Sequence, residues 1–384
     1  MIGGREPVAV VGGGAGGLAA ALALARRGIA SRVFEGSANS KEIDRGDIIH
    51  AGSQRLLRAW GVWPAIETMT PLPFGNFRIL DGDGRLLLDL DGRSLMGTGT
   101  TLNALRHAQI VRGLRSAAQD SEWIELHDAE PVAELAVTAG RITGVRTARG
   151  DYPAPLTVLA AGTKSKLRDR HFGRPAEHDY DRSFFNARVQ ALPSYRDCGY
   201  YVLDARGILI MAPLPGGEQR IGLQFVTSDR RDRPSARNFA DLAGRVFRPL
   251  RTESLSFVDG QVYRLRSLLA DRWAVPGAVL LGDTAHTVHP TGGQGMNLAF
   301  GDAETLAQAI RFADSGDALD RATDRYAALR RAQVRRVHRR SHLGGLAAGL
   351  TRPAAVAARA NLVRLLDRVP PAKRQVFQRL VDVR

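Results

Sequence analysis

The chain contains a single cysteine, Cys198, among its 384 residues. One cysteine excludes an intrachain disulfide and a cysteine-based zinc site, so we expect a reducing, cytoplasmic environment. The sequence also lacks internal repeats and a recognisable secretion signal, because glycines in turn spacing interrupt the apolar N-terminal stretch. With 44% hydrophobic residues the chain can bury a large core, and we expect two interleaved domains.

The net charge of +15 is concentrated at one end. Fourteen Lys or Arg and two Asp lie in residues 330–384, which leaves +12 in this segment and +3 elsewhere. Arg331, Arg335 and Arg339 recur at i,i+4 and predict a basic stripe on a helix, and residues 354–369 predict a second amphipathic helix. Three interpretations stay open: a solvated face, contact with an anionic membrane or a membrane-dissolved substrate, and contact with a protein or a nucleotide phosphate. Few aromatics accompany the charge, so we expect no nucleic-acid partner.

The most informative motif follows four β-forming residues near the N-terminus. Its glycines, Gly12, Gly14 and Gly17, have the Gly-x-Gly-x-x-Gly spacing, and an Ala/Leu-rich helix pattern begins at Ala15. Such a strand, turn and helix bind a dinucleotide, because the turn lets backbone amides approach a pyrophosphate at the helix N-terminus. Glu35 ends the next apolar run, where a carboxylate would bind a ribose hydroxyl. The pattern predicts FAD or NAD.

A second glycine-rich run lies near the other end of the chain. It follows another predicted strand and contains Gly282, Asp283, His286, Pro290, Gly293, Gly295, Met296 and Asn297. This run resembles the Gly-Asp motif of FAD-dependent aromatic hydroxylases, the single-component flavoprotein monooxygenases of the para-hydroxybenzoate hydroxylase type. The resemblance implies that Asp283 binds the ribitol of FAD and that Pro290 lies near the flavin ring. It also implies that the amides of residues 295–297 bind the flavin pyrimidine, where a helix N-terminus favours the charge of the reduced ring.

Two intermediate segments extend the resemblance, and one of them departs from the family pattern. Arg45 takes the position of an arginine that reaches the FAD pyrophosphate, and a guanidinium fork suits a diphosphate. His107 stands where the family has a residue touching the cofactor, although a capping or surface histidine is the alternative. Gly162 belongs to a segment resembling the family's Asp-Gly motif, but Ala161 replaces the aspartate. We therefore expect a weak nicotinamide interaction, and reduction by a partner reductase stays open.

The order of these motifs predicts an α/β fold with a Rossmann-like FAD-binding domain interleaved with a β-rich substrate domain, plus C-terminal helices. The expected FAD-binding domain comprises residues 1–75, 99–175 and 271–315, the substrate domain residues 76–98 and 176–270, and the helical segment residues 316–384. We expect hairpin turns at residues 81–84 and 215–217.

The resemblance implies a monooxygenase that hydroxylates an electron-rich aromatic compound of phenol, quinol or quinolone type. It would use NAD(P)H as transient reductant, dioxygen, and a flavin C4a-hydroperoxide. The oligomeric state stays open, and the location could be peripheral at a membrane through the basic helices. A flavin-dependent dehydrogenase or reductase of a quinone- or prenyl-type substrate, and a non-catalytic flavoprotein, remain as alternatives.

Residue candidates for the chemistry come from the predicted substrate sheet and from the second glycine-rich run. Pro290 is expected beside the flavin, and His286 either relays a proton or makes a structural hydrogen bond. No metal is expected, because His286 and His289 lack further ligands. The expected pocket residues, each of which could equally belong to the core, are Phe184, Tyr201, Ile210 and Met211.

Overall fold

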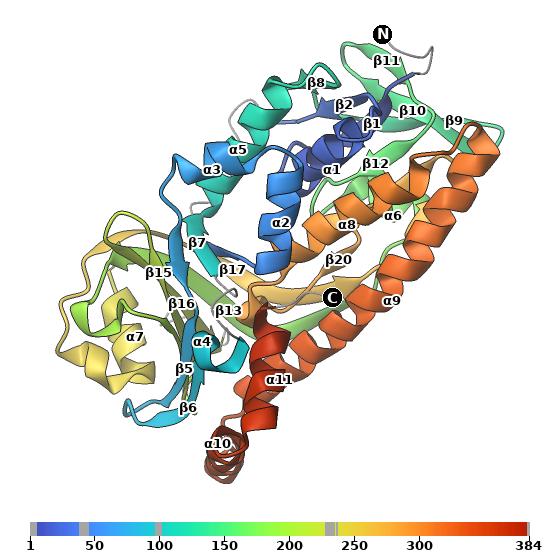
Figure 1. The fold of residues 1–384 in the computed structure, drawn as a ribbon. Helices are drawn as coiled ribbons and strands as arrows, with labels where there is room; N and C mark the ends of the chain where they lie inside the picture. The colour runs from blue at the N-terminus through green and yellow to red at the C-terminus, as the bar shows by residue number, and fades with distance from the viewer. Residues whose placement is uncertain (1–5, 38–45, 97–101, 227–234, 236, 382–384) are drawn as a thin grey trace.

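A computed structural model of the protein describes residues 6–37, 46–96, 102–226, 235 and 237–381. A mostly parallel sheet lies at one end of an elongated molecule and a large antiparallel sheet at the other (Figure 1). The long helix α9 (Gly316–Ala348) runs along one side of the molecule. The predicted fold class, a Rossmann-like part interleaved with a β-rich part and followed by C-terminal helices, is confirmed.

The parallel sheet is built from short strands, and its central strands are largely apolar and fully buried. Its six strands are, in spatial order, β18 (Ala274–Val275), β19 (Ala278–Leu280), β12 (Thr157–Leu159), β1 (Val8–Val11), β2 (Ser31–Phe34) and β8 (Ile124–His127). All neighbours pair in parallel except β18 with β19. Helix α1 (Ala15–Ala25) packs between α5 (His107–Gln119) and α8 (Gly295–Ile310). Buried β-branched strands covered by helices are typical of a dinucleotide-binding sheet.

Two small sheets accompany the parallel one. The first contains β3 (Gly46–Ile49), β7 (Leu102–Arg106) and β4 (Leu72–Phe74), and leads into α2 (Ala51–Ala59) and α3 (Trp63–Glu67). The second contains β9 (Glu134–Thr138), β10 (Arg141–Thr147) and β11 (Gly150–Pro153), and no motif in the sequence indicates it. The short helix α6 (Lys166–His171) follows β12.

The antiparallel sheet joins segments from four parts of the chain. Its eight strands are, in order, β20 (His286–Thr287), β17 (Phe257–Leu269), β13 (Glu177–Gln190), β16 (Glu218–Val226), β15 (Ile208–Leu214), β14 (Gly199–Leu203), β5 (Asn76–Asp81) and β6 (Leu86–Asp91). The predicted hairpins β5–β6 and β15–β16 are confirmed, and β14 joins β5 in parallel. The division of the chain into domains by residue number remains a prediction.

The two faces of this sheet are covered differently. Helix α7 (Phe239–Val246) packs on one face through a cluster that includes Phe185, Met211 and Leu223. Short 3-10 segments, η1 (Pro193–Tyr195) and η3 (Arg248–Arg251), border this cluster. The other face is turned toward the parallel sheet and carries Phe184 and Ile210. Because side chains alternate along a strand, neighbouring residues of β15 belong to different faces.

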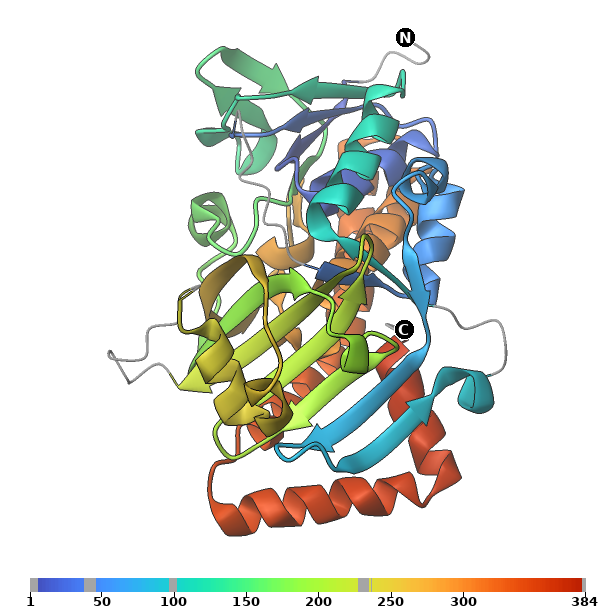
Figure 2. The ribbon, with the colours of Figure 1, turned by 90° about the vertical axis from the view of Figure 1, so that its left-hand side faces the viewer.

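The predicted C-terminal helices are present. Helix α9 ends beside α10 (Pro353–Asp367), and Arg359 of α10 donates hydrogen bonds to the carbonyl oxygens of Ala347 and Ala348. Helix α11 (Pro370–Val381) then packs against α4 (Gly92–Met96) through the buried ring of Phe377. Figure 2 shows α10 lying across the end of the large sheet. Among the described helices, none has a stretch long and apolar enough to cross a bilayer.

Candidate active site

The N-terminal glycines each satisfy a different steric requirement. Gly12 has φ +112°, and a Cβ there would lie 2.3 Å from the carbonyl oxygen of Ala160. A Cβ at Gly17 would lie 1.9 Å from the carbonyl oxygen of Gly12, so this glycine allows α1 to pack against the turn. A Cβ at Gly14, the N-cap of α1, would meet nothing within 4 Å. Gly14 therefore opens onto free space, while Gly12 and Gly17 hold the turn together. Ala15, the first helical residue, is half-buried against the core, and its predicted contact with the cofactor remains a prediction.

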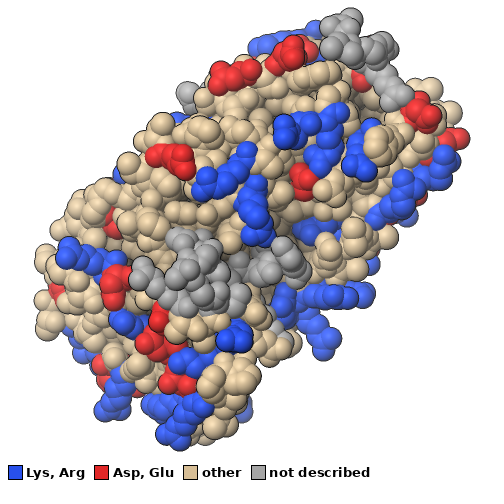
Figure 3. All heavy atoms as spheres, in the orientation of Figure 1, with Lys and Arg blue, Asp and Glu red and all other residues tan. Residues whose placement is uncertain are grey.

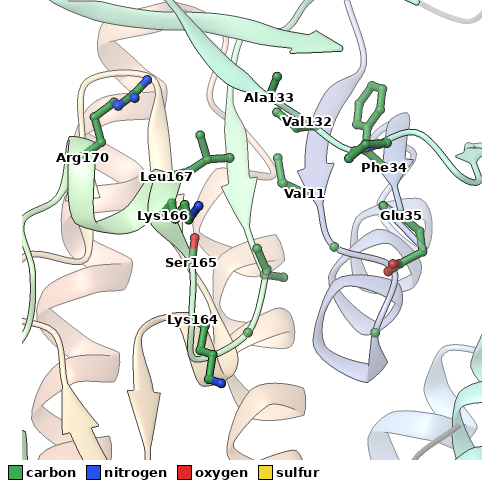
Figure 4. A pocket seen from close by; sticks show the side chains of 17 residues that line it. Val11, Phe34, Glu35, Val132, Ala133, Lys164, Ser165, Lys166, Leu167 and Arg170 are labelled. Atoms are coloured by element: carbon green, nitrogen blue, oxygen red, sulfur yellow. The ribbon is translucent and has the colours of Figure 1, made fainter. Parts of the chain in front are cut away.

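That free space is a cavity of about 590 Å³ between the turn and the segment after β12. Figure 4 shows Glu35 on one wall and Lys164, Ser165 and Lys166 on the other. The carboxylate of Glu35 accepts hydrogen bonds from the backbone N–H groups of Gly13 (2.8 Å) and Ser37 (2.9 Å). These contacts fix the carboxylate at the cavity wall, and its remaining lone pairs can accept further hydrogen bonds.

The second glycine-rich run forms two 3-10 turns before α8. The first turn, η4 (Gly282–Thr284), exposes the side chain of Asp283, whose Oδ1 lies 3.9 Å from the Cβ position of Gly295. Residues 295–297 form the first turn of α8, where backbone N–H groups have no intrahelical partner. The second turn, η5 (Pro290–Gly292), ends at Gly293 with φ +58°. A carboxylate and three amide donors thus converge at the start of α8.

A buried ionic network holds the first of these turns. The fully buried carboxylate of Asp302 accepts a hydrogen bond from the N–H of Gly282 (3.1 Å), contacts His286 Nε2 (2.7 Å) and pairs with Arg330 Nε (2.8 Å). Burial would raise the pKa of Asp302, but His286 and Arg330 lower it to about 2. His286 has no exposed surface and stacks on Trp273. The structure therefore places His286 inside a structural network.

A second link joins α8 to the segment before α2. The side chain of Asn297 accepts a hydrogen bond from the N–H of His50 (3.0 Å) and donates to the carbonyl oxygens of Ile48 (2.9 Å) and Gly293 (3.0 Å). Asn297 is therefore fully engaged through its side chain, and only its backbone N–H is oriented as a helix-terminal donor. The second glycine-rich run did not indicate that the Asn297 side chain would link α8 to the segment before α2.

The remaining predicted cofactor residues have the following positions. Arg45 lies outside the described residues. His107 Nδ1 contacts the carboxylate of Asp47 at 2.6 Å and so links α5 to β3. Gly162 has φ +76°, and the exposed Ala161 before it lines the cavity where the family motif has a carboxylate. These three roles toward the cofactor remain predictions.

Three of the four predicted pocket residues lie on one face of the large sheet. Phe184, Ile210 and Tyr201 pack in one cluster on the face toward the parallel sheet. The hydroxyl of Tyr201 donates to the carbonyl oxygen of Thr291 in η5 at 2.7 Å. Burial raises the pKa of Tyr201 to about 12 despite the opposing charge of Arg220, so the phenol remains a donor at neutral pH. Met211 follows Ile210 in β15 and points to the α7 face, so the structure does not bring it to the other three.

Two buried polar residues share the face of Tyr201. Arg220 of β16 is 8% exposed and Asn186 of β13 is 7% exposed. Arg220 Nε donates to Asn186 Oδ1 at 2.8 Å, and the guanidinium carbon lies 6.0 Å from the centre of the Phe184 ring. The hydrophobic pattern of β16 gave no reason to single out this arginine.

The donor set fits FAD. The N-termini of α1 and α8 have backbone amides without intrahelical partners, and such amides are suited to a diphosphate and to the polar edge of a flavin. Gly14 leaves open space of the kind that a diphosphate needs, and the carboxylates of Glu35 and Asp283 are suited to accept hydrogen bonds from sugar hydroxyls. No group of three or more His, Cys, Asp or Glu suited to a metal ion occurs within the described part of the chain. The fold and the site define a flavin-dinucleotide-binding protein.

Comparison with known sequences agrees with this class. Residues 5–341 match the model of the FAD binding domain family, and the chain belongs to this family. It is 29% identical to 6-methylpretetramide 4-monooxygenase of Streptomyces rimosus, over 98% of this chain and 92% of the relative. It is 27% identical to 3-demethoxyubiquinol 3-hydroxylase of Escherichia coli (strain K12), over 86% of this chain and 85% of the relative.

Solved structures show the same fold at lower identity. p-Nitrophenol 4-monooxygenase PnpA of Pseudomonas putida superposes with a TM-score of 0.85, 20% identity and 99% coverage of both chains. A variant of HpxO of Klebsiella pneumoniae, solved with FAD, has a TM-score of 0.81 and 18% identity, with 98% of this chain and 99% of the other covered. FAD is accordingly the cofactor of this protein.

The contrast between Gly14 and Gly17 gives a direct test. Gly14→Val should leave the FAD-free protein folded but raise the dissociation constant for FAD at least about tenfold, because the side chain fills the diphosphate space. Gly17→Ala should instead destabilise the FAD-free protein by about 3 kcal/mol, because its Cβ overlaps a backbone oxygen. Urea unfolding and FAD titration measure the two effects.

Asp283→Ala is the matched change at the expected ribitol end of the site. It should weaken the binding free energy of FAD by about 1.5–3 kcal/mol. Unchanged FAD affinity in both Gly14→Val and Asp283→Ala would contradict the proposed site.

Acidification should destabilise the fold through two buried histidines. Burial lowers the pKa of His50 and of His289 to about 4, from 6.5. Each folded pKa is depressed, so the folded state binds fewer protons, and stability is lost as pH falls from about 6.5 to 4. The full loss is about 3 kcal/mol per histidine. Urea unfolding at fixed FAD should show a shallower pH dependence in His289→Asn than in the control His178→Asn, which removes an exposed histidine; equal slopes would refute the assignment.

Proposed function

We propose that the protein hydroxylates an electron-rich aromatic small molecule of phenol, quinol or quinolone type, using NAD(P)H and dioxygen. It is an FAD-dependent monooxygenase. The observation that carries the proposal is the hydrogen bond between Tyr201 and Thr291, because it joins the apolar face of the large sheet to the turn beside the flavin-binding end of α8. The names of the relatives, 6-methylpretetramide 4-monooxygenase and 3-demethoxyubiquinol 3-hydroxylase, support the same reaction class.

The chain's own residues bind, orient and exclude water. Glu35, Asp283 and the amides of α1 and α8 hold the cofactor, which when bound and reduced supplies the activation of dioxygen. Phe184 and Ile210 form an apolar wall in which water competes poorly. Tyr201 fixes the distance between this wall and Pro290, the residue proposed to lie beside the flavin ring. His286 has a structural role, because its buried ring contacts Asp302, the carboxylate that holds η4 in place.

We propose that this enzyme binds its nicotinamide reductant weakly. Ala161 is exposed at the cavity wall and offers no carboxylate there, whereas Lys164 and Lys166 bring positive charge to the same wall. Positive charge attracts phosphates, including those of FAD in this cavity, but does not orient a nicotinamide ring. A partner reductase remains the alternative electron source.

Labelled dioxygen distinguishes this function from the alternatives. A true aromatic substrate should accelerate NAD(P)H oxidation by the purified holoenzyme and acquire one oxygen atom from ¹⁸O₂, measured by product mass. A dehydrogenase or reductase would turn over without the label in product, and a non-catalytic flavoprotein would bind ligands without consuming NAD(P)H. Label found only in peroxide or water, for every compound that stimulates flavin reduction, would defeat the monooxygenase assignment.

We further propose that the C-terminal helices contact an anionic membrane surface. Leu343, Leu346 and Leu350 lie at i, i+3 and i+7 of the α9 end, and are 53%, 46% and 39% exposed. Leu362, Leu365 and Val369 repeat that spacing along α10 and its end, and are 59%, 57% and 41% exposed. In Figure 3, Lys and Arg atoms gather along the edge followed by α9 and at the tip near α10. Exposed apolar rows beside basic side chains are typical of interfacial helices.

Vesicle binding tests this surface. The protein should co-sediment with vesicles containing phosphatidylserine and should bind neutral phosphatidylcholine vesicles poorly. Binding to the anionic vesicles should weaken as the salt concentration rises, because the Debye length shortens to about 8 Å at physiological ionic strength. Replacing Leu362 and Leu365 together by Glu should reduce binding several-fold, because both apolar groups and charge attraction are lost. The control Val137→Glu changes an exposed residue of the distant β9 strand. If the protein binds neither kind of vesicle, the basic helices form a solvated face and the membrane proposal is wrong.

A further inference from the structure

The aromatic wall of the proposed substrate site is closed to solvent in this structure. Phe184 has no exposed surface and Ile210 is 6% exposed, and both lie on the face of the large sheet that is turned toward the parallel sheet. An aromatic molecule reaches these side chains only if an element that covers the sheet moves. Enzymes that exclude water from a site commonly use a movable covering element to admit the substrate.

Helix α9 covers part of this face but is fixed in place. Arg330 of α9 pairs with the buried carboxylate of Asp302 at 2.8 Å. Ser341 Oγ donates to the carbonyl oxygen of His289 at 2.9 Å, directly before η5. Displacing α9 would leave a buried charge unpaired, which is strongly unfavourable. The moving element is therefore a different one.

Helix α11 is held to the molecule mainly by one side chain. Phe377 has no exposed surface, whereas the other side chains of residues 370–378 are exposed or half-buried. Arg374 Nε donates to the carbonyl oxygen of Leu95 in α4 at 3.0 Å, and this contact lies at the surface. An element anchored by a single buried ring opens at a much lower free energy than the whole fold.

The connection between α10 and α11 allows α11 to move by itself. Helix α10 ends at Asp367, and α11 begins with Pro370 and Pro371, which supply no N–H groups to continue the hydrogen bonds of α10. Lys373 pairs with Asp367 at 2.9 Å, so this ion pair spans the connection and does not tie α11 to the sheet. Figures 1 and 2 show α11 rising from α10 toward the region where the large sheet meets the flavin-binding part.

The place that Phe377 occupies leads to the aromatic wall. The ring centres of Phe377 and Phe77 are 6.4 Å apart, and those of Phe77 and Tyr201 are 6.0 Å apart. Tyr201 packs against both the Phe377 cluster and the wall. Leu214 of the same cluster touches the start of β3, since a Cβ at Gly46 would lie 2.7 Å from Leu214 Cδ2. A row of apolar side chains thus runs from α11 to Tyr201, and a phenyl ring closes its outer end.

We propose that α11 is the gate of the substrate site. Phe377 keeps the gate closed, and a swing of α11 about residues 368–369 removes the ring and admits an aromatic substrate. This inference rests on the proposed function and adds the route by which the substrate enters. The position that the phenyl ring leaves is lined by apolar and aromatic side chains, which suit another aromatic ring. When the ring returns, it shields the site from water.

Thiol labelling tests the opening of α11 without a substrate. Leu90 is fully buried in the Phe377 cluster, so Leu90→Cys should react slowly with dithiobis(nitrobenzoate), an aromatic disulfide reagent. Adding Phe377→Ala should raise this rate at least about tenfold, because loss of a buried ring shifts a local equilibrium by about a hundredfold or more. The native Cys198 is 1% exposed in the cluster on the α7 face and should keep its own rate. Equal acceleration of both thiols, or of neither, would overturn the gate.

Stopped-flow binding to the oxidised holoenzyme tests whether this opening admits an aromatic ligand. The probes are 2-naphthol and 4-hydroxyquinoline, read by perturbation of the flavin absorbance. In Phe377→Ala both the association and the dissociation rate constants should rise at least about tenfold, because each scales with the fraction of open molecules. Phe377→Leu keeps an apolar side chain and should give a smaller rise.

The two rate constants distinguish a gate from other roles of Phe377. A rise in the dissociation rate constant alone would make Phe377 a wall of the site, and unchanged rate constants would make it a core residue. Either result overturns the gate. If neither probe perturbs the flavin, the labelling of Leu90→Cys by the aromatic reagent decides alone.

Phe239→Ala is the matched control. Phe239 is a 1% exposed phenylalanine of α7, on the opposite face of the large sheet. Its replacement also removes a buried ring and should destabilise the fold, but it should leave both probe rate constants unchanged. Faster probe binding in this variant would indicate general loosening of the fold and would contradict the gate.

The outcomes also separate this proposal from the reaction class. If Phe377→Ala speeds probe entry but no substrate acquires labelled oxygen, α11 is a gate and the monooxygenase assignment is wrong. If a substrate acquires labelled oxygen but Phe377→Ala changes no rate constant, the reaction class holds and the gate is wrong.

Discussion

The buried carboxylate of Asp302 is the interaction on which the arrangement of the cofactor site depends. It lies in α8 but accepts from Gly282 in η4, contacts His286 in β20 and pairs with Arg330 in α9. One side chain thus connects the end of the parallel sheet, an edge strand of the large sheet and the longest helix. Removing one partner from such a buried network leaves an unpaired charge and typically lowers the free energy of unfolding by about 3–5 kcal/mol. The position of Asp283 beside α8 follows from this network.

Two neutral side chains hold together the segments that meet near the start of α8. Asn297 fixes the start of α8 to the strand before α2, and Tyr201 fixes the large sheet to η5. Both side chains are neutral and form hydrogen bonds with backbone groups, so these contacts keep their geometry without a charge. The region where we propose that the flavin ring lies is therefore bounded by backbone groups, while the proposed substrate side is lined by replaceable side chains. Such a division is consistent with a fold whose relatives are named for compounds as different as 6-methylpretetramide and 3-demethoxyubiquinol.

The sequence predicted the fold class and the glycine-rich turns because those features are local. Spacing alone shows which glycines a turn requires, and the structure places a backbone oxygen where a Cβ of Gly12 or Gly17 would lie. The side-chain role of Asn297 was not predictable, since its partners are 247 and 249 residues away. Met211 was expected beside Ile210, but strand alternation turns it to the other face, and a run of apolar residues buried on both faces hides that alternation. Arg220 escaped notice because its burial depends on β3, a separate segment.

The parallel pairing of β5 with β14 has a consequence for synthesis of the protein. The hairpin β5–β6 emerges from the ribosome early, but its inner neighbour follows more than 100 residues later. At typical translation rates that delay is on the order of ten seconds. During it, the edge of β5 that later pairs with β14 lacks that partner, and unpaired strand edges can recruit other strands. Productive translation therefore depends on shielding the nascent hairpin, a demand that the finished fold no longer reveals.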